Sequence, residues 1–228
     1  MRERLEKLFP FYAIIPIAAC LIFNVLVYNG NRLLTADRVH FDLSIPFIDG
    51  NIPFWRWMIV FYVLSYVYWA AGFLVVAREN RAFCYEMCAG EMIGKFFCLV
   101  FFLAMPTVMP DWPSGTFEIN NGIDWLTQFI YDMDEPNNLF PSIHCSESWF
   151  CLRAIFGSKK TNVPFRIVAV VMTVGIFAST VLVKQHVFVD IIGGVAVAEA
   201  GLLLGRKLRA GRLFERLEPK ALRVSENV

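Results

Sequence analysis

Charged residues are scarce in this chain. They make up 18% of the 228 residues, and the formal net charge is +1. Such a balance creates no overall basic field of the kind that attracts nucleic acid, so we expect no nucleic-acid partner. The sequence also has no Gly/Ser-rich linker and no internal repeat, and histidine occurs only 3 times. We therefore expect a single domain over residues 1–228.

Apolar residues are abundant instead. Hydrophobic residues make up 57% of the chain and aromatic residues 15%, which is too apolar for an ordinary soluble domain of this length. The longer stretches reach the roughly 30 Å of a hydrocarbon core at about 1.5 Å per residue, whereas the fourth covers only about 20 Å. The sequence predicts an all-α polytopic membrane protein, a six-transmembrane-helix bundle with helices at 11–28, 54–77, 92–109, 144–156, 163–183 and 187–205.

Basic residues cluster at every second joint between these stretches: before the first, and after the second, fourth and sixth. The loop 111–142 has no Lys or Arg and carries six acidic residues. The positive-inside rule therefore predicts an integral protein of the plasma (inner) membrane with both termini cytoplasmic and this loop outside. The start of the chain imitates a signal peptide around Cys20, but the residues that follow stay apolar, so we expect a retained helix.

Two histidines lie at the predicted outer ends of helices. His144 closes the segment Pro141-Ser142-Ile143-His144, and His186 lies in the tight joint between the fifth and sixth helices. Asp190 follows His186 at i+4, where a helix places its carboxylate within reach of the imidazole N–H. A base with an orienting carboxylate is typical of a nucleophile site. The alternative is that His186 and Asp190 merely cap the sixth helix.

The segments 141–144 and 179–190, with Ser179, His186 and Asp190 at the matching spacing, resemble two of the three signature motifs of the type-2 phosphatidic acid phosphatase and vanadium haloperoxidase superfamily. The resemblance to its integral membrane branch covers nearly the whole chain. It implies that His186 attacks phosphorus, that His144 is the general acid, and that Asp190 orients the nucleophile. It also implies that Ser142 donates a hydrogen bond to phosphate.

The first motif of that superfamily, a Lys followed seven residues later by Arg-Pro, has no counterpart here, and Thr180 replaces the usual Arg of the third motif. Another cation must then balance the phosphate. Lys184, two residues before the nucleophile, is the leading substitute, and Arg56 is an additional phosphate contact or an interfacial anchor. The Lys184-Gln185-His186 combination is similar to the divergent group that includes inositol phosphorylceramide synthases.

We therefore predict a metal-independent enzyme without cofactors that hydrolyses a lipid-linked phosphate at the outer membrane face through a phosphohistidine. The alternatives are a phosphotransferase that moves a phospho-headgroup between lipids, and an inactive lipid-binding or transport member. The expected partners are a lipid phosphate and the membrane, while the oligomeric state and the lipid stay open. Outside the site, Lys95 and Arg153 are expected to snorkel toward the cytoplasm, and Gly193-Gly194 to allow a neighbouring helix to approach closely.

Overall fold

The computed structural model describes residues 9–35, 37–109, 112–134 and 137–218. Within them the chain is helical, with two isolated β-bridges and no strand, which confirms the all-α prediction. The elements are η1 (Phe11–Ala13), α2 (Ile14–Val25), η2 (Leu26–Gly30), α3 (Asn31–Thr35), α4 (Pro46–Asp49), η3 (Arg56–Met58), α5 (Ile59–Glu79), α6 (Arg81–Ala104), α7 (Gly122–Met133), α8 (Ile143–Gly157), α9 (Val163–Leu182), α10 (Phe188–Lys207) and α11 (Arg212–Leu217).

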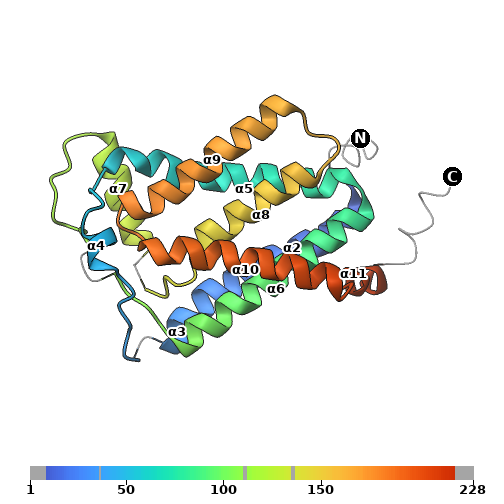
Figure 1. Cartoon of the computed structure of the whole chain (residues 1–228), viewed down its shortest axis with the longest axis horizontal. Helices are drawn as coiled ribbons and strands as arrows, with labels where there is room; N and C mark the ends of the chain where they lie inside the picture. Colours follow the sequence, from blue (N-terminus) through green and yellow to red (C-terminus); the bar gives the residue numbers. More distant parts are fainter. Residues whose placement is uncertain (1–8, 36, 110–111, 135–136, 219–228) are drawn as a thin grey trace.

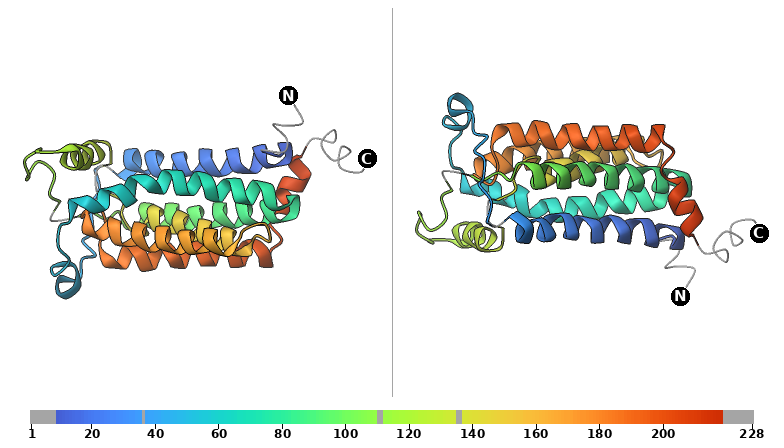
Figure 2. Two further views of the ribbon diagram at one scale, coloured as in Figure 1. Left: turned by 90° about the horizontal axis from the view of Figure 1, so that it is seen from above. Right: turned by 90° about the horizontal axis from the view of Figure 1, so that it is seen from below.

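The long helices lie side by side along one axis (Figure 1). The short helices α4 and α7 lie at one end of the bundle, and α11 lies at the other end beside the start of α2 (Figure 2). The helix α8 is central, because it packs on α5, α9 and α10. Its first residues, which include His144, lie at the end of the bundle that carries α7, because Tyr62 contacts both His144 and Asp134, the residue that ends α7.

Within the described part of the chain, five helical segments are long and apolar enough to cross a membrane. They are Phe11–Gly30, Arg56–Glu79, Arg81–Ala104, Val163–Leu182 and Phe188–Lys207. The prediction of six spanning helices is thus confirmed for five. The remaining helix, α8, has 15 residues and reaches only about 22 Å at 1.5 Å per residue. Four of its polar side chains, those of His144, Ser146, Glu147 and Ser148, are buried against neighbouring helices, so this part of α8 does not need a lipid-facing apolar surface.

Side-chain caps fix where several helices begin. Asn80 accepts a hydrogen bond from the Phe83 N–H at the start of α6, and Asn162 accepts one from the Phe165 N–H at the start of α9. Ser142 caps α8 by accepting from the Cys145 N–H. Such caps satisfy N–H groups that have no partner within the helix and stabilise a helix by about 1 kcal/mol each. The cap on α8 has a further consequence, because it places Ser142 beside the candidate site.

Glycines in α10 let it approach α8 closely, as the sequence predicts. A Cβ atom on Gly194 would lie 2.6 Å from the Ser142 carbonyl oxygen, and one on Gly193 would lie 2.4 Å from the Phe140 ring. Any side chain at Gly194 would therefore collide with backbone that cannot give way. This contact holds the starts of α8 and α10 together, and those are the two helix ends that carry the histidines.

The expectation that Lys95 snorkels toward the cytoplasm is wrong. Its side chain is 1% exposed, and its Nζ lies 2.5 Å from Glu147 Oε2 on α8 and 3.5 Å from Glu91 Oε1. The charge faces the bundle interior because this side of α6 packs on other helices, where paired carboxylates offset the cost of burying the ammonium. Arg153, by contrast, is 48% exposed and pairs with Glu199 on α10.

Candidate active site

His186 is held by Asp190 in one defined orientation. The turn between α9 and α10 is held by the Gln185 and His186 N–H groups, which both donate to the Thr180 carbonyl oxygen. Asp190 Oδ2 lies 3.0 Å from His186 Nδ1 and also accepts from the Val187 N–H. A carboxylate can only accept, so Nδ1 carries the hydrogen and Nε2 presents a lone pair. The predicted pairing at i+4 is therefore present in the structure.

The lone pair of His186 Nε2 faces Ser142, whose Oγ lies 3.1 Å away. Since Ser142 Oγ accepts from the Cys145 N–H, its own hydrogen is available to donate. The Ser142 N–H in turn donates to the Asp190 carbonyl oxygen. These bonds bring the N-termini of α8 and α10 together, and the partial positive charge of a helix N-terminus favours an anion.

Aromatic rings from one face of α5 enclose His144. The ring centroids of Tyr62, Trp69 and Tyr66 lie 4.3, 5.3 and 6.4 Å from that of the imidazole. His144 is 7% exposed, and within the described residues its Nε2 has no hydrogen-bond partner. Burial, followed by the positive charges of His186 and Lys95, lowers the pKa of the His144 imidazole, and the charge of a bound phosphate together with the aromatic faces would oppose that shift. Its unpartnered Nε2 is the atom that remains available to a ligand.

The other ring nitrogen of His144 leads to a second carboxylate. Nδ1 lies 3.5 Å from the Tyr62 hydroxyl, and that hydroxyl donates to Asp134 Oδ2 at 2.7 Å. Burial raises the pKa of the Asp134 carboxyl to about 6, against the opposing effect of a positive His186. Gln185 Nε2 also donates to the Asp134 carbonyl oxygen, which ties the end of α7 to the joint before His186. Each histidine thus has its own carboxylate, one in direct contact and one through a tyrosine.

A small cavity of about 20 Å³ lies between the two histidines. Their ring centroids are 6.0 Å apart. The space holds roughly one water molecule and is too small for a phosphate ester. Binding of a substrate therefore requires some of the lining to move, and the other lining residues are Tyr28, Phe102, Asp134, Asn137, Asn138, Leu139, Ile143 and Gln185.

The segment before His144 is fixed by Thr107 and Asn138. Thr107 Oγ1 accepts from the Leu139 and Phe140 N–H groups, and its carbonyl oxygen accepts from the Asn138 N–H. Asn138 has φ of 55° and exchanges hydrogen bonds with the Thr35 hydroxyl on α3. Asparagine tolerates this left-handed backbone better than most residues. The polar turn therefore positions the start of α8 without a glycine.

The two predicted phosphate cations lie away from the cavity. Lys184 Nζ donates to the carbonyl oxygens of Asp49, at 3.1 Å, and Ile52, at 2.6 Å. Arg56 Nη1 lies 2.8 Å from Asp124 Oδ1, and its guanidinium stacks over Phe117. The structure thus brings together His144, His186, Asp190 and Ser142, whereas the charged ends of Lys184 and Arg56 are bound elsewhere.

Sequence reasoning missed Tyr62, Asp134 and Asp49. Tyr62 and Asp134 are 72 residues apart, and no local spacing links them. Asp49 Oδ1 accepts from the Phe188 N–H at the start of α10, while its carbonyl oxygen accepts from Lys184. The only available signal for Tyr62 was the i, i+4, i+7 spacing of Tyr62, Tyr66 and Trp69, which also fits an ordinary aromatic face of a membrane helix.

The fold and the site define a helical membrane protein with paired histidines at one end of its bundle. Residues 31–204 match the family model of the PAP2 superfamily, and because this is more than half of the chain, the protein belongs to that superfamily. No curated protein and no solved structure matches the chain. Membership suggests phosphatase-type chemistry on lipid phosphates. The predicted superfamily is confirmed, and the closer likeness to inositol phosphorylceramide synthases stays a prediction.

Proposed function

We propose that this protein is a membrane lipid phosphate phosphatase that hydrolyses a phosphomonoester or pyrophosphate of a lipid at the outer membrane face. The observation that carries the proposal is that His186 and His144 both line one cavity. Asp190 fixes the tautomer of His186 that has a lone pair at Nε2, and His144 Nε2 is buried without a partner among the residues that the structure describes. One is suited to attack and the other to transfer a proton.

In the first step, His186 Nε2 forms a bond to phosphorus while the bond from phosphorus to the lipid oxygen breaks. His144 gives its Nε2 proton to that departing oxygen, so no free alkoxide is released. Asp190 keeps the hydrogen on His186 Nδ1 and stabilises the positive charge that develops on the ring. The products of this step are neutral His144, a phosphohistidine on His186 and a lipid alcohol, or a lipid monophosphate when the substrate is a pyrophosphate.

In the second step, water attacks phosphorus and the bond to His186 Nε2 breaks. Neutral His144 must now accept a proton at Nε2, which requires the remaining hydrogen to lie on Nδ1. The Tyr62 hydroxyl donates to Asp134, so its oxygen faces His144 Nδ1 as an acceptor. Tyr62 and Asp134 therefore favour the tautomer that acts as a base. Transfer of the water proton to His144 restores the starting state and releases phosphate.

The charge of the phosphate is balanced in this proposal by three kinds of donor. Ser142 Oγ lies 3.1 Å from the nucleophilic nitrogen and can turn its hydrogen to a phosphate oxygen. Backbone N–H groups in the first turn of α8 add the positive end of that helix. Lys184 supplies a full charge once its ammonium leaves the two carbonyls that it contacts before substrate binding. No metal ion or other cofactor takes part in this mechanism.

The orientation of the protein follows from its charge pattern. Basic residues cluster at the end of the bundle that carries α11, and the acidic segment that contains α7 lies at the opposite end (Figure 2). We place the basic end in the cytoplasm and the histidines at the outer face of the plasma (inner) membrane. The 12-residue α7, with Trp125 and Phe129 exposed and stacked on each other, would then rest among the outer headgroups.

A phosphotransferase is the second candidate, because the first step is the same when an acceptor alcohol replaces water in the second. The Lys184-Gln185-His186 joint and the missing first motif favour it. Both functions are tested by incubating purified protein with phosphatidic acid, lysophosphatidic acid and a polyprenyl diphosphate, with and without an acceptor lipid alcohol. Phosphate release without acceptor supports the phosphatase, and transfer only with acceptor supports the transferase. Absence of both would leave a lipid-binding or transport protein.

A further inference from the structure

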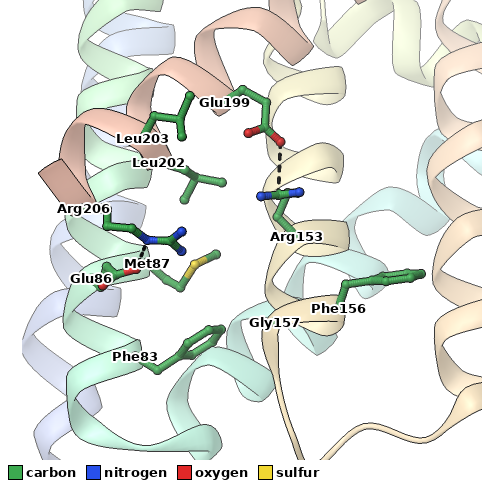
Figure 3. Close-up of a pocket in the computed structure, with 10 residues that line it drawn as sticks. All are labelled: Phe83, Glu86, Met87, Arg153, Phe156, Gly157, Glu199, Leu202, Leu203 and Arg206. Carbon is green, nitrogen blue, oxygen red and sulfur yellow. Dashed lines mark hydrogen bonds and ion pairs between the residues drawn. The ribbon is translucent and has the colours of Figure 1, made fainter.

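A second and larger cavity lies at the other end of the bundle, between α6, α8 and α10. Its volume is about 250 Å³, and none of its lining residues belongs to the histidine site. Figure 3 shows the apolar side chains that line it and two ion pairs that cross from helix to helix. The apolar lining comes from Phe83, Met87, Phe156, Leu202 and Leu203.

In both ion pairs, some nitrogen and oxygen atoms of the charged groups make no hydrogen bond to the described residues. Arg153 Nε lies 3.1 Å from Glu199 Oε1, and Arg206 Nε lies 2.8 Å from Glu86 Oε1. Within the described residues, neither arginine has a partner at its two Nη atoms. Glu199 Oε1 also accepts from Trp149 Nε1, so the Oε2 atoms of the two glutamates are the unengaged ones. The cavity therefore presents two guanidinium forks and two carboxylate oxygens.

These charged groups favour a polar occupant over lipid tails. The Arg153 side chain is 48% exposed and that of Glu199 is 28% exposed, although Glu199 belongs to the membrane-spanning segment Phe188–Lys207. Charged side chains that face hydrocarbon cost several kcal/mol, so lipid tails alone are a poor filling. The η nitrogens of an arginine match the oxygens of a phosphate in a two-pronged contact.

The carboxylates restrict which phosphate fits. Two arginines and two glutamates give the cavity a formal charge of zero, so a headgroup with negative charge alone would meet Glu86 and Glu199 unfavourably. A headgroup with both a phosphodiester and a primary ammonium satisfies both kinds of group. The half-exposed Phe156 and Leu203 at the cavity offer apolar surface to the glycerol and the first carbons of the acyl chains.

We propose that this cavity binds the headgroup of a zwitterionic aminophospholipid from the leaflet opposite to the histidine site. The phosphodiester contacts the Nη atoms of Arg153 and Arg206, and the ammonium donates to Glu86 and Glu199. The bound lipid links the end of α8 to α6 and α10 at a point where these helices diverge (Figure 3). This site does not depend on the chemistry proposed for the histidines.

The test is lipid binding by the full chain in detergent, measured by native mass spectrometry. The probes are dioleoyl phosphatidylethanolamine, dioleoyl phosphatidylglycerol and free glycerophosphoethanolamine. The wild-type protein should bind the ethanolamine lipid at least about tenfold more tightly than either of the others, in line with the strength of charged hydrogen bonds. Equal binding of the two lipids by the wild type would overturn the proposal, and that comparison needs no variant.

Two double variants then locate the site. Arg153→Gln with Arg206→Gln should lower the affinity for the ethanolamine lipid about tenfold, whereas the matched control Lys207→Gln with Arg212→Gln, at exposed positions of the same end, should not. Glu86→Gln with Glu199→Gln should reverse the preference toward phosphatidylglycerol, because the cavity becomes net positive. An unchanged preference in the glutamate variant, or unchanged affinity in the arginine variant, would contradict the assignment.

Discussion

The Tyr62 hydroxyl donates a hydrogen bond to Asp134 Oδ2 at 2.7 Å, while its oxygen faces His144 Nδ1 at 3.5 Å. Tyr62 therefore links α5 to Asp134 at the end of α7, next to His144, the proposed general acid. Hydrogen bonds of this kind are often long before substrate binds and shorten in the complex. The contact gives His144 a fixed tautomer, and it depends on a carboxyl group that titrates in an accessible range.

The first prediction concerns that carboxyl group. Because the pKa of Asp134 is raised to about 6, Asp134 is ionised at pH 7.5 and protonated at pH 5. Only the ionised form makes a charged hydrogen bond with Tyr62. Asp134→Asn should therefore lower kcat about tenfold at pH 7.5, while at pH 5 the variant and the wild type should be nearly equal. The measurement is the ratio of the variant kcat to the wild-type kcat across this pH range.

Two further comparisons test whether the effect is specific to Asp134 and Tyr62. Asp132→Asn, which removes an exposed carboxyl in the last turn of α7, should leave kcat unchanged at both pH values. Tyr62→Phe should resemble Asp134→Asn at pH 7.5, and the double variant should be no worse than either single one because both act on His144. A ratio that stays constant from pH 5 to pH 7.5 would mean that Asp134 has only a structural role.

The second prediction concerns the histidine pair. His186→Ala should abolish turnover because the nucleophile is lost, and His144→Ala should lower kcat roughly a thousandfold, or about 4 kcal/mol of barrier. The size-exclusion elution volume and the helix content of both variants should stay close to those of the wild type. His40→Ala is the matched control and should keep wild-type kcat. Full activity in His186→Ala would rule out the phosphohistidine mechanism.

The third prediction is that the reaction needs no metal ion. Among the residues that the structure describes, no three His, Cys, Asp or Glu side chains are grouped so that they could hold one. Turnover should survive EDTA, and vanadate should inhibit because it imitates the five-coordinate phosphoryl transition state. Loss of activity in EDTA that added magnesium or zinc restores would contradict the mechanism.

The fourth prediction concerns the orientation in the membrane. All six native cysteines are buried, so a single introduced cysteine can be labelled selectively. Thr116→Cys, in the acidic segment, should react with an impermeant maleimide on intact cells, and Lys159→Cys should react only after permeabilisation. The reverse pattern would move the histidines to the cytoplasmic leaflet.

What the sequence reveals depends on how local the signal is. The His186 and Asp190 contact is predicted from the i+4 spacing and is present at 3.0 Å, although His186 lies just before α10 and Asp190 reaches back to it from the first turn of that helix. The Tyr62 and Asp134 contact joins residues 72 positions apart, and only the packed bundle brings them together. Lys95 was misjudged for a related reason, because hydropathy gives the depth of a residue in the membrane but not whether its side of the helix faces lipid or Glu147. The short α8 likewise depends on its neighbours for burial.

The last prediction separates two roles of Lys184. Its backbone has φ of 55°, which is uncommon for a residue other than glycine, and its ammonium contacts the Asp49 and Ile52 carbonyl oxygens. If the ammonium turns to the phosphate when the cavity opens, Lys184→Gln should lower kcat/KM ten- to hundredfold, which corresponds to about 1.5–3 kcal/mol of transition-state stabilisation. Lys184→Arg should retain part of the activity, since charge is kept while geometry changes.

Thermal unfolding of the same variants provides the discriminating measurement. We expect the Tm of Lys184→Gln to change little relative to the loss in kcat/KM, and the exposed control Lys207→Gln to leave both quantities at wild-type values. The contrary result is a lowered Tm with wild-type kcat/KM. It would mean that Lys184 has only a structural role, in which it holds the loop of Asp49 and Ile52 against the turn before His186. Ser142 and the α8 N–H groups would then have to balance the phosphate charge.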